Sequence, residues 1–204
     1  MGLYHDRVLP RVIDVACGTK YEKPHRARVA DGLHGDVVEI GFGSGLNVPY
    51  YPASVRRVAA VEPADLGWRM AAARVAESPI PVERAGLDGQ QLPFADASFD
   101  TALSTWTLCT IPDAVQALRE VGRVLRPGGT LHFVEHGLAP DAGVATWQRR
   151  LEPVQKRVFG GCHLTRDIPA LIEEAGLRVK GLDRFYGEGG PRVFTAYYLG
   201  VAAA

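Results

Sequence analysis

The sequence predicts an α/β fold with a doubly wound, mainly parallel sheet, helices on both faces and an antiparallel strand at the C-terminal end. Three observations predict it. Short β-branched runs alternate with helical patterns, a glycine-rich turn follows the first run, and two strand-like runs close the chain with no helix between them. Alternating strands and helices are typical of parallel sheets that are covered on both sides.

The first predicted strand, residues 36–40, breaks into the glycine turn Gly41-Phe42-Gly43-Ser44-Gly45, which is expected to open a helix. Apolar spacing and flanking turn residues predict the following elements in the same way. The further strands are expected over residues 58–63, 80–83, 98–104 and 130–135, and the helices over 66–75, 113–125 and 167–175. Pro127-Gly128-Gly129 should end the second of these helices and turn the chain into the strand that follows.

The last part of the chain breaks the alternation. Residues 177–186 and 193–199 are joined by Gly187-Glu188-Gly189-Gly190, which predicts a hairpin. The sheet should therefore end with an antiparallel strand.

Composition excludes several classes of protein. The 204 residues carry 23 basic and 23 acidic side chains, and 47% are hydrophobic. Such a chain can bury a core, so disorder is not expected, and it lacks the charge excess of nucleic-acid binders. The sequence predicts one domain over residues 1–204, with 1–35 as an N-terminal arm or lid. No apolar run is long enough to cross a bilayer and no secretory core is present, which predicts a cytoplasmic protein.

The cysteines suggest neither a disulfide framework nor a metal. Cys17, Cys109 and Cys162 are odd in number, widely spaced and without a Cys-x-x-Cys pair, so we expect reduced thiols and no zinc or other metal site. The 19 Arg against 4 Lys are typical of a GC-rich bacterial gene.

The glycine turn and an acid at the end of the next strand predict a nucleoside-containing cofactor. Glycine lets a ligand approach the backbone, and Glu62 can accept both hydroxyls of a ribose. The dinucleotide fingerprint needs a third glycine where this chain has Leu46, and no Walker loop exists. Both points favour a cofactor without a pyrophosphate.

Four motifs in order resemble those of class I S-adenosylmethionine-dependent methyltransferases: Val38–Gly45, Glu62-Pro63, Leu92–Asp100 and Leu118–Gly129. The resemblance implies a seven-stranded Rossmann-like sheet, with S-adenosylmethionine as cofactor and S-adenosylhomocysteine as product. It implies that Gly41 and Gly43 approach the methionine part. The full set of cofactor residues that it implies is Glu39, Gly41, Gly43, Asn47, Glu62 (ribose), Pro63, Asp88 and Gly89 (adenine), and Thr105 and Trp106 (sulfonium).

The last third, above all Gly161–Asp167, is similar to a methyltransferase-like group that includes thiol S-methyltransferases. The resemblance implies S-methylation of a small-molecule thiol. O- or N-methylation of a metabolite, quinone precursor or phospholipid headgroup stays open, as does a cofactor sensor without catalysis. Animal members carry an N-terminal membrane segment that this chain lacks, so we expect no integral membrane segment, no nucleic acid partner, and a monomer or homodimer.

Methyl transfer needs positioning more than covalent catalysis, and a thiol acceptor gains from a nearby base. His136, after the fifth strand, and His163 are the candidate bases. The candidate substrate-binding residues are His25, Cys109, Trp147 and Arg166. Each has a structural alternative: His136 can cap its strand, His163 can belong to a helix-start cluster with Thr165 as N-cap, and the cysteines and aromatic residues can simply pack in the core.

Overall fold

The computed structural model describes residues 4–204. Seven strands form one sheet in the order β3-β2-β1-β4-β5-β7-β6, and only β7 runs antiparallel to its neighbours. The strands are β1 Gly35–Ile40, β2 Val55–Val61, β3 Val82–Gly86, β4 Phe99–Thr105, β5 Leu125–His136, β6 Arg178–Tyr186 and β7 Ala196–Ala203. The predicted fold class is confirmed.

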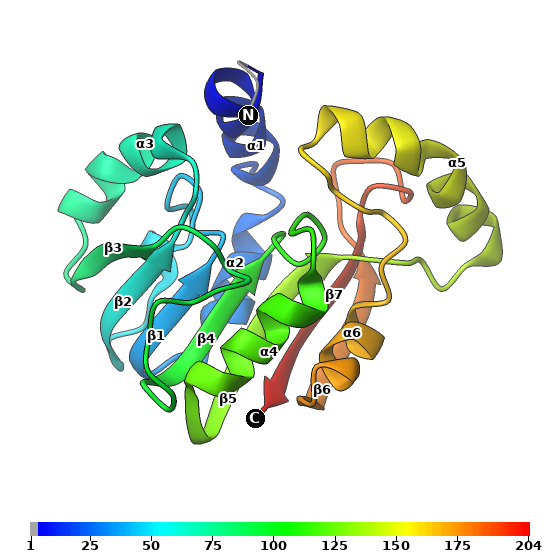
Figure 1. Ribbon diagram of the computed structural model, residues 1–204. Coiled ribbons are helices and arrows are strands. Elements are labelled where there is room, and N and C mark those ends of the chain that lie inside the picture. The colour runs from blue at the N-terminus through cyan, green and yellow to red at the C-terminus, as the bar shows by residue number, and fades with distance from the viewer. Residues whose placement is uncertain (1–3) are drawn as a thin grey trace.

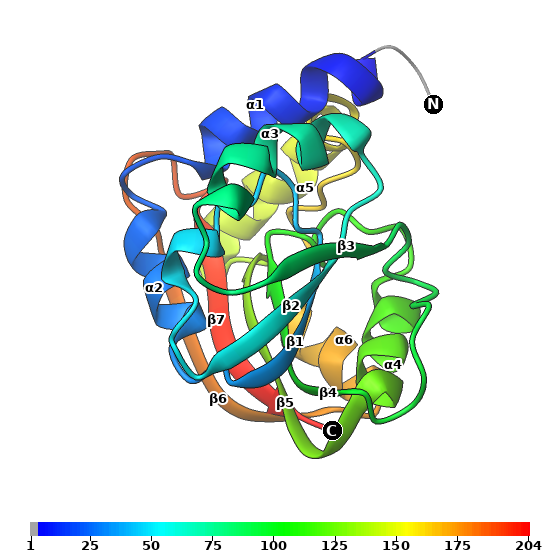
Figure 2. The same ribbon diagram turned by 90° about the vertical axis from the view of Figure 1, so that its left-hand side faces the viewer.

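Helices cover both faces of the sheet (Figures 1 and 2). Two of them, α2 and α3, pack on one face, and α4 and α6 pack on the other, while α1 and α5 lie over the carboxyl edge of the parallel strands. The helices are the π-helix η1 Tyr4–Val8, α1 Leu9–Cys17, α2 Lys23–Ala30, the 3-10 helix η2 Val48–Tyr50, α3 Asp65–Ala76, α4 Ala114–Val124, α5 Ala142–Val158 and α6 Ile168–Glu174.

The core has two main layers, one on each side of the sheet. On the α4 side, Leu118 and Val121 meet Ile168 and Ile172 of α6 over Phe133 of the central strands. On the other side, α2 contributes Val29 and Ala30 to a layer over β1, β4 and β5. Residues 23–30 therefore belong to the packed domain, whereas α1 lies at its edge.

One expectation about the glycine turn is wrong. The turn is expected to open a helix, but only the short η2 lies between β1 and β2. Pro49 and Pro52 lie in this connection, and a proline pushes the residue before it toward extended backbone, as Tyr51 shows with ψ 125°. The turn thus leads to a short, tightly held loop.

The start of β5 also differs from the expectation. The sequence places a turn at Pro127-Gly128-Gly129 and a strand from residue 130, but α4 passes directly into β5 at Leu125. Phe99 of β4 pairs with Leu125 and Thr101 pairs with Thr130, so the register shifts here and the irregular stretch lies within the strand.

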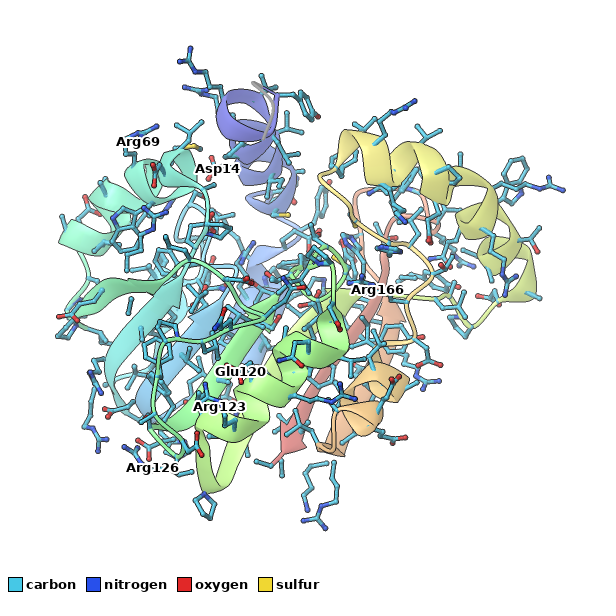
Figure 3. The ribbon with its side chains drawn as sticks, in the orientation of Figure 1. Asp14, Arg69, Glu120, Arg123, Arg126 and Arg166 are labelled. Carbon is cyan, nitrogen blue, oxygen red and sulfur yellow. The ribbon has the colours of Figure 1, made fainter. Side chains whose placement is uncertain are left out.

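Charged side chains close the amino edge of the sheet. Asp100 accepts from Arg56 at 3.0 Å and from Arg126 at 2.5 Å, and Asp36 pairs with Arg56 and with Arg57 at 3.3 Å. Figure 3 shows Arg126 at this edge, at the opposite end of the sheet from α1 and α5. The chemistry of the site lies at the other edge.

Candidate methyltransferase site

The glycine turn after β1 leaves room for a ligand. Gly41 and Gly43 have φ of +69° and +59°, which L side chains rarely adopt. A Cβ at Gly41 would lie 1.9 Å from Oγ1 of Thr107, so the loop after β4 requires glycine there. A Cβ at Gly43 would meet only the carbonyl oxygen of Gly41, at 3.9 Å. Gly43 therefore presents open backbone toward the space above the sheet.

Glu62 closes the turn from the neighbouring strand. It is 6% exposed, and its two oxygens accept the backbone N–H groups of Gly43 at 2.6 Å and Ala64 at 2.7 Å. Burial raises the pKa of this carboxyl, and the two N–H donors oppose the shift. Glu62, the residue predicted to bind the ribose, is thus fixed beside the glycine turn. Pro63, which follows it, is exposed.

A buried polar chain connects α2 with the turn. Arg26 donates to Oδ1 of Asn47 at 2.6 Å, and Nδ2 of Asn47 donates to Glu39 at 2.9 Å and to Oγ1 of Thr105 at 2.9 Å. The hydroxyl of Tyr51 donates to the second oxygen of Glu39. Burial raises the pKa of Glu39 to about 7, although these two donors lower it. Glu39 therefore holds Asn47 and Thr105 at the carboxyl edge rather than facing solvent.

Trp106 adopts a left-handed conformation directly after β4. Its φ is +50°, which is uncommon for a bulky residue and costs about 1–3 kcal/mol. The guanidinium of Arg26 lies 4.7 Å from the centroid of its ring, and Tyr197 packs edge-on at 5.8 Å. Backbone strain of this kind persists where neighbouring groups hold the residue in place. Here Arg26 and Tyr197 hold the indole.

The predicted adenine residues lie on the loop after β3. Oδ1 of Asp88 accepts the backbone N–H of Gln90 at 2.8 Å, so the exposed Asp88 shapes its own turn. Gly89 is buried, and a Cβ there would lie 2.9 Å from Ile111.

Helix α1 is fastened over the glycine turn. Oδ1 of Asp14 accepts from the hydroxyl of Ser44 at 2.5 Å and faces Nη1 of Arg74 at 3.4 Å. Figure 3 shows Asp14 on the side of α1 that faces α3. The arm predicted from the sequence therefore meets the turn through a defined contact.

Three residues distant in sequence gather on the acceptor side. Sγ of Cys109 lies 3.7 Å from Sγ of Cys162, and each sulfur lies 3.9 Å from Nδ1 of His136. The cysteines are 1% and 5% exposed, and both are reduced. Burial alone lowers the pKa of His136, but the Cys162 thiol and the charge of Glu135 raise it. The predicted His136 and Cys109 thus share one site, which Cys162 completes.

His25 joins this side of the site as an aromatic contact. Its ring lies 4.7 Å from Phe185 and 5.7 Å from Tyr197, whose hydroxyl donates to Glu22 at 2.9 Å. Buried atoms without a hydrogen-bond partner among the described residues also lie on this segment. They are Oε2 of Glu22, Nδ1 of His25 and Nε of Arg26. A bound ligand or water can satisfy such atoms.

Three other predicted residues are engaged elsewhere. Nδ1 of His163 lies 3.1 Å from Glu152 on α5, and burial, Arg166 and Lys156 lower the pKa of the imidazole. Arg166 donates to the carbonyls of Leu108, Ile111 and Pro112 and so holds the loop after β4 (Figure 3). Trp147 is 54% exposed on α5 and stacks with Arg150.

The helix-start expectation near His163 needs a correction. Thr165 does not cap α6, because its hydroxyl donates to Glu152. Asp167 is the N-cap and accepts the N–H of Ala170 at 3.3 Å. The side chain of Thr165 is therefore part of the contact with α5.

A cavity of about 450 Å³ along β2 and β3, lined by Arg56 and Glu83 among others, contains none of the predicted site residues.

Sequence reasoning left Arg26, Tyr51, Tyr197 and Cys162 out of the predicted site residues. The chain offers no signal for the first of these, because an arginine in a short polar helix normally faces solvent. Cys162 lies in the segment that carries the family resemblance and directly follows Gly160 and Gly161, a pair of glycines that could have indicated a special turn there.

Comparisons with known proteins agree with this architecture. A family model described as a methyltransferase domain matches residues 38–133. A putative methyltransferase from Haloferax volcanii, solved with the Trm112 activator, superposes with a TM-score of 0.73 over 98% of this chain and 96% of its own, at 16% identity. A Thermotoga maritima structure, described as a possible histamine N-methyltransferase, has a TM-score of 0.69 over 98% and 99%, at 21% identity. These structures support the fold.

Similarity in sequence decides the family. Thiol S-methyltransferase TMT1B of Rattus norvegicus is 38% identical over 145 residues, and thiol S-methyltransferase TMT1A of Homo sapiens is 35% identical over 146 residues. Each alignment covers 68% of this chain and 58% of the relative. The chain belongs to the class I S-adenosylmethionine-dependent methyltransferases.

The chain thus spans less than two thirds of the length of those two relatives. Phosphatidylethanolamine N-methyltransferase of Cereibacter sphaeroides is 32% identical over 143 residues, which cover 65% of this chain and 66% of that protein. In the described part of the chain, residues 4–204, no helix is both long and apolar enough to cross a bilayer. The family is therefore shared by relatives with different acceptors.

Proposed function

We propose that this protein transfers the methyl group of S-adenosylmethionine to the sulfur of a small-molecule thiol. The observation that carries the proposal is the juxtaposition of two features. The open turn at Gly43 and the carboxylate of Glu62 can hold the donor. In the cluster of Cys109, His136 and Cys162, the ring of His136 lies 6.5 Å from that of Trp106. The similarity to thiol S-methyltransferases supports the choice of acceptor.

The residues at the carboxyl edge fit the donor. Gly43 keeps free the volume that a Cβ would fill, and Glu62 is fixed at the end of β2, where a ribose diol can reach it. The unpartnered Nε of Arg26 and Oε2 of Glu22 offer further buried polar atoms to a ligand. Thr105 and Trp106 would lie near the sulfonium, and Asp88 and Gly89 near the adenine.

When bound, the donor supplies a methyl carbon activated by a sulfonium, which an acceptor sulfur attacks to leave S-adenosylhomocysteine. The protein's task is to align the two groups and to exclude water. Trp106 contacts Arg26, which bonds Asn47 beside the glycine turn, and also packs near Tyr197 and His136 of the acceptor side. Asn47 and Glu39 hold Thr105 in place beneath it.

The acceptor side is suited to a small, weakly polar molecule. Trp106, His136 and Tyr197 pack with ring centroids 5.1–6.5 Å apart, and His25 and Phe185 extend this wall. Apolar walls with a few polar groups are typical of small-molecule sites. A thiol must also lose its proton, and the cluster at His136 is the part of the wall that can favour the thiolate.

The test is an acceptor assay with labelled S-adenosylmethionine. We expect transfer to small alkyl and aryl thiols, and at most weak transfer to phenols and amines of matched size. Matched pairs such as thiophenol and phenol keep shape constant and change only the nucleophilic atom. Transfer confined to phenols or amines would overturn the thiol assignment, and lack of binding of S-adenosylhomocysteine by calorimetry would overturn the donor assignment.

The similarity to phosphatidylethanolamine N-methyltransferase favours a second candidate, N-methylation of an aminophospholipid headgroup. Vesicles with and without phosphatidylethanolamine belong in the same assay. Label recovered in the lipid fraction, with none in thiols, would replace the first candidate by the second.

A further inference from the structure

The cluster of Cys109, His136 and Cys162 has the dimensions of a metal site. A tetrahedral zinc ion with Zn–S of about 2.3 Å and Zn–N of about 2.0–2.1 Å holds two sulfurs about 3.8 Å apart and a sulfur and a nitrogen about 3.6 Å apart. The observed separations are 3.7 Å between the sulfurs and 3.9 Å from each sulfur to Nδ1 of His136. The three atoms lie within 4.8 Å of one another.

We propose that Cys109, His136 and Cys162 bind a zinc ion whose fourth coordination position takes the sulfur of the acceptor thiol. The second half of this statement rests on the proposed function, and the first half does not. The cysteines are widely spaced in the sequence, which therefore gives no sign of a zinc site. Only the fold brings the three side chains together.

The three ligand atoms are a set that suits zinc. Two soft sulfurs and one imidazole match the preference of zinc, whereas calcium and magnesium require oxygen ligands. A disulfide between Cys109 and Cys162 would need a sulfur–sulfur distance of about 2.05 Å, far shorter than the observed 3.7 Å. The imidazole placed equally far from both sulfurs argues for a shared central ion.

Backbone contacts hold each cysteine in place. Oε2 of Glu135 accepts the N–H of Cys109 at 3.2 Å, and so fixes the loop after β4. Gly160 and Gly161 have φ of +58° and +95°, two successive values that other residues rarely adopt. They end α5 and turn the chain so that Cys162, whose N–H bonds the carbonyl of Phe159 at 3.1 Å, faces inward.

Three protein ligands leave one position for an exogenous group. Among the side chains that the structure describes, no fourth cysteine, histidine or carboxylate joins the cluster. Catalytic zinc sites have this arrangement, with three protein ligands and one exchangeable position, whereas structural sites use four. The cluster shares its buried layer with Trp106 and Tyr197, and His136 packs near both rings, so a group at the exchangeable position would meet the acceptor side.

Coordination would prepare the acceptor for attack. A thiol that binds zinc releases its proton to solvent and stays as a thiolate, with its electron pair on the metal-bound sulfur. Two cysteine thiolates already balance the double charge of zinc. An added acceptor thiolate therefore makes the cluster negative and electron-rich, which favours attack on a positively charged donor.

Metal content tests the first half without any acceptor. We expect about one zinc per chain in protein purified without chelator, measured by mass spectrometry of the metal. Cobalt added to the metal-free protein should give thiolate-to-metal charge-transfer absorption. Cys17→Ser is the matched control, because Cys17 packs against the same buried layer but is not one of the three ligands, and it should keep both signals.

Cys109→Ser, Cys162→Ser and His136→Gln should each weaken zinc binding. Loss of an outer contact to a metal ligand already costs about 10–100-fold, so loss of a ligand should cost at least about 100-fold. Binding of S-adenosylhomocysteine checks that each variant is folded. Two outcomes would overturn the site whatever the variants do. One is the absence of a thiolate-to-cobalt band after cobalt is added to the metal-free wild-type protein. The other is a Cys109–Cys162 disulfide in protein purified under air.

The second half is tested by adding a small alkyl thiol to the cobalt form. We expect the charge-transfer absorption to change with the thiol and to stay constant with the matched alcohol. An unchanged spectrum at saturating thiol would overturn the fourth position and leave the metal site standing. A metal site in a protein that methylates only phenols or amines would refute the proposed function alone.

Discussion

At the residue scale, carboxylates with different tasks lie at the ends of adjacent strands. Glu62 meets the open turn and can be reached by a ligand, whereas Glu39 is enclosed by Asn47 and Tyr51. Both were predicted as cofactor residues from their motif. Their positions at strand ends follow from the sequence, but the enclosure of Glu39 depends on Tyr51 and Arg26, which the pattern does not place.

Glu62→Ala should weaken binding of S-adenosylhomocysteine. A carboxylate hydrogen bonded to a ribose contributes about 1–3 kcal/mol, so we expect a dissociation constant about 5–150-fold higher, measured by calorimetry. Glu83→Gln, an exposed change on the next strand, is the control. Equal affinities in wild type and Glu62→Ala would contradict the assigned role.

Glu39 should make stability depend on pH near neutrality. Its folded pKa of about 7 lies above that of an unfolded glutamate, so its contribution is fully present below about pH 4 and is lost as the pH rises through 7. Glu39→Gln cannot ionise. The free energy of unfolding of wild type relative to this variant, from urea titrations, should therefore fall by at most about 3 kcal/mol between pH 5 and pH 8. A constant difference would show that Glu39 has an ordinary pKa.

At the scale of elements, each predicted strand is found, and the errors are at connections and at three helices that were not predicted, α1, α2 and α5. Asp36–Ile40 and the runs near 98–104 and 177–186 could be predicted because buried strands have a clear composition. The loop after β1 could not, because its path depends on Phe42 packing against Ala71 of α3, a contact between distant residues. The cluster of Cys109, His136 and Cys162 could not be predicted either, because the position of Cys162 depends on the turn at Gly160 and Gly161 after α5.

The contact of Asp14 with Ser44 makes α1 a candidate lid over the donor. Asp14→Ala removes a hydrogen bond of about 0.5–1.5 kcal/mol, so S-adenosylhomocysteine should dissociate about 2–10-fold faster in stopped-flow fluorescence. Val15→Ala, on the same helix and 74% exposed, should leave the rate unchanged. A rate that does not respond to Asp14→Ala would mean that α1 does not gate the donor.

At the scale of the whole molecule, the two edges of the sheet have separate tasks. The carboxyl edge carries the buried polar chain and the cysteine cluster, and the amino edge carries the ion pairs of Asp36 and Asp100. Balanced charge in the composition predicted neither arrangement. It excluded a large basic surface, and the structure distributes the arginines of this edge into pairs with acids.

Asp100→Asn should destabilise the fold from the edge opposite the site. Burial opposes ionisation, but the N–H of Asp36 and the guanidinium of Arg126 hold the pKa of Asp100 below its ordinary value. We expect a loss of about 1–3 kcal/mol at pH 7 in denaturant titrations. Because a depressed pKa stabilises only the ionised form, the loss should fade as the pH falls below about 4.

Asp96→Asn is the matched control, since Asp96 pairs with Arg123 but is 78% exposed, and exposed pairs contribute little. Unchanged binding of S-adenosylhomocysteine by Asp100→Asn would confirm that the edges act independently. An Asp100→Asn variant as stable as the wild type at pH 7 would contradict the importance of these pairs.

The reversed direction of β7 has a practical consequence. Tyr197 pairs with His136 beside the site, and Ala203 pairs with Thr130 at the far edge. The described C-terminal residues therefore lie at the opposite end of the strands from α1 and α5 (Figure 1). A molecule anchored to a sensor surface through its last residues would present the donor and acceptor openings to the flowing solution. Immobilisation at that end should therefore suit direct measurement of the ligand kinetics described above.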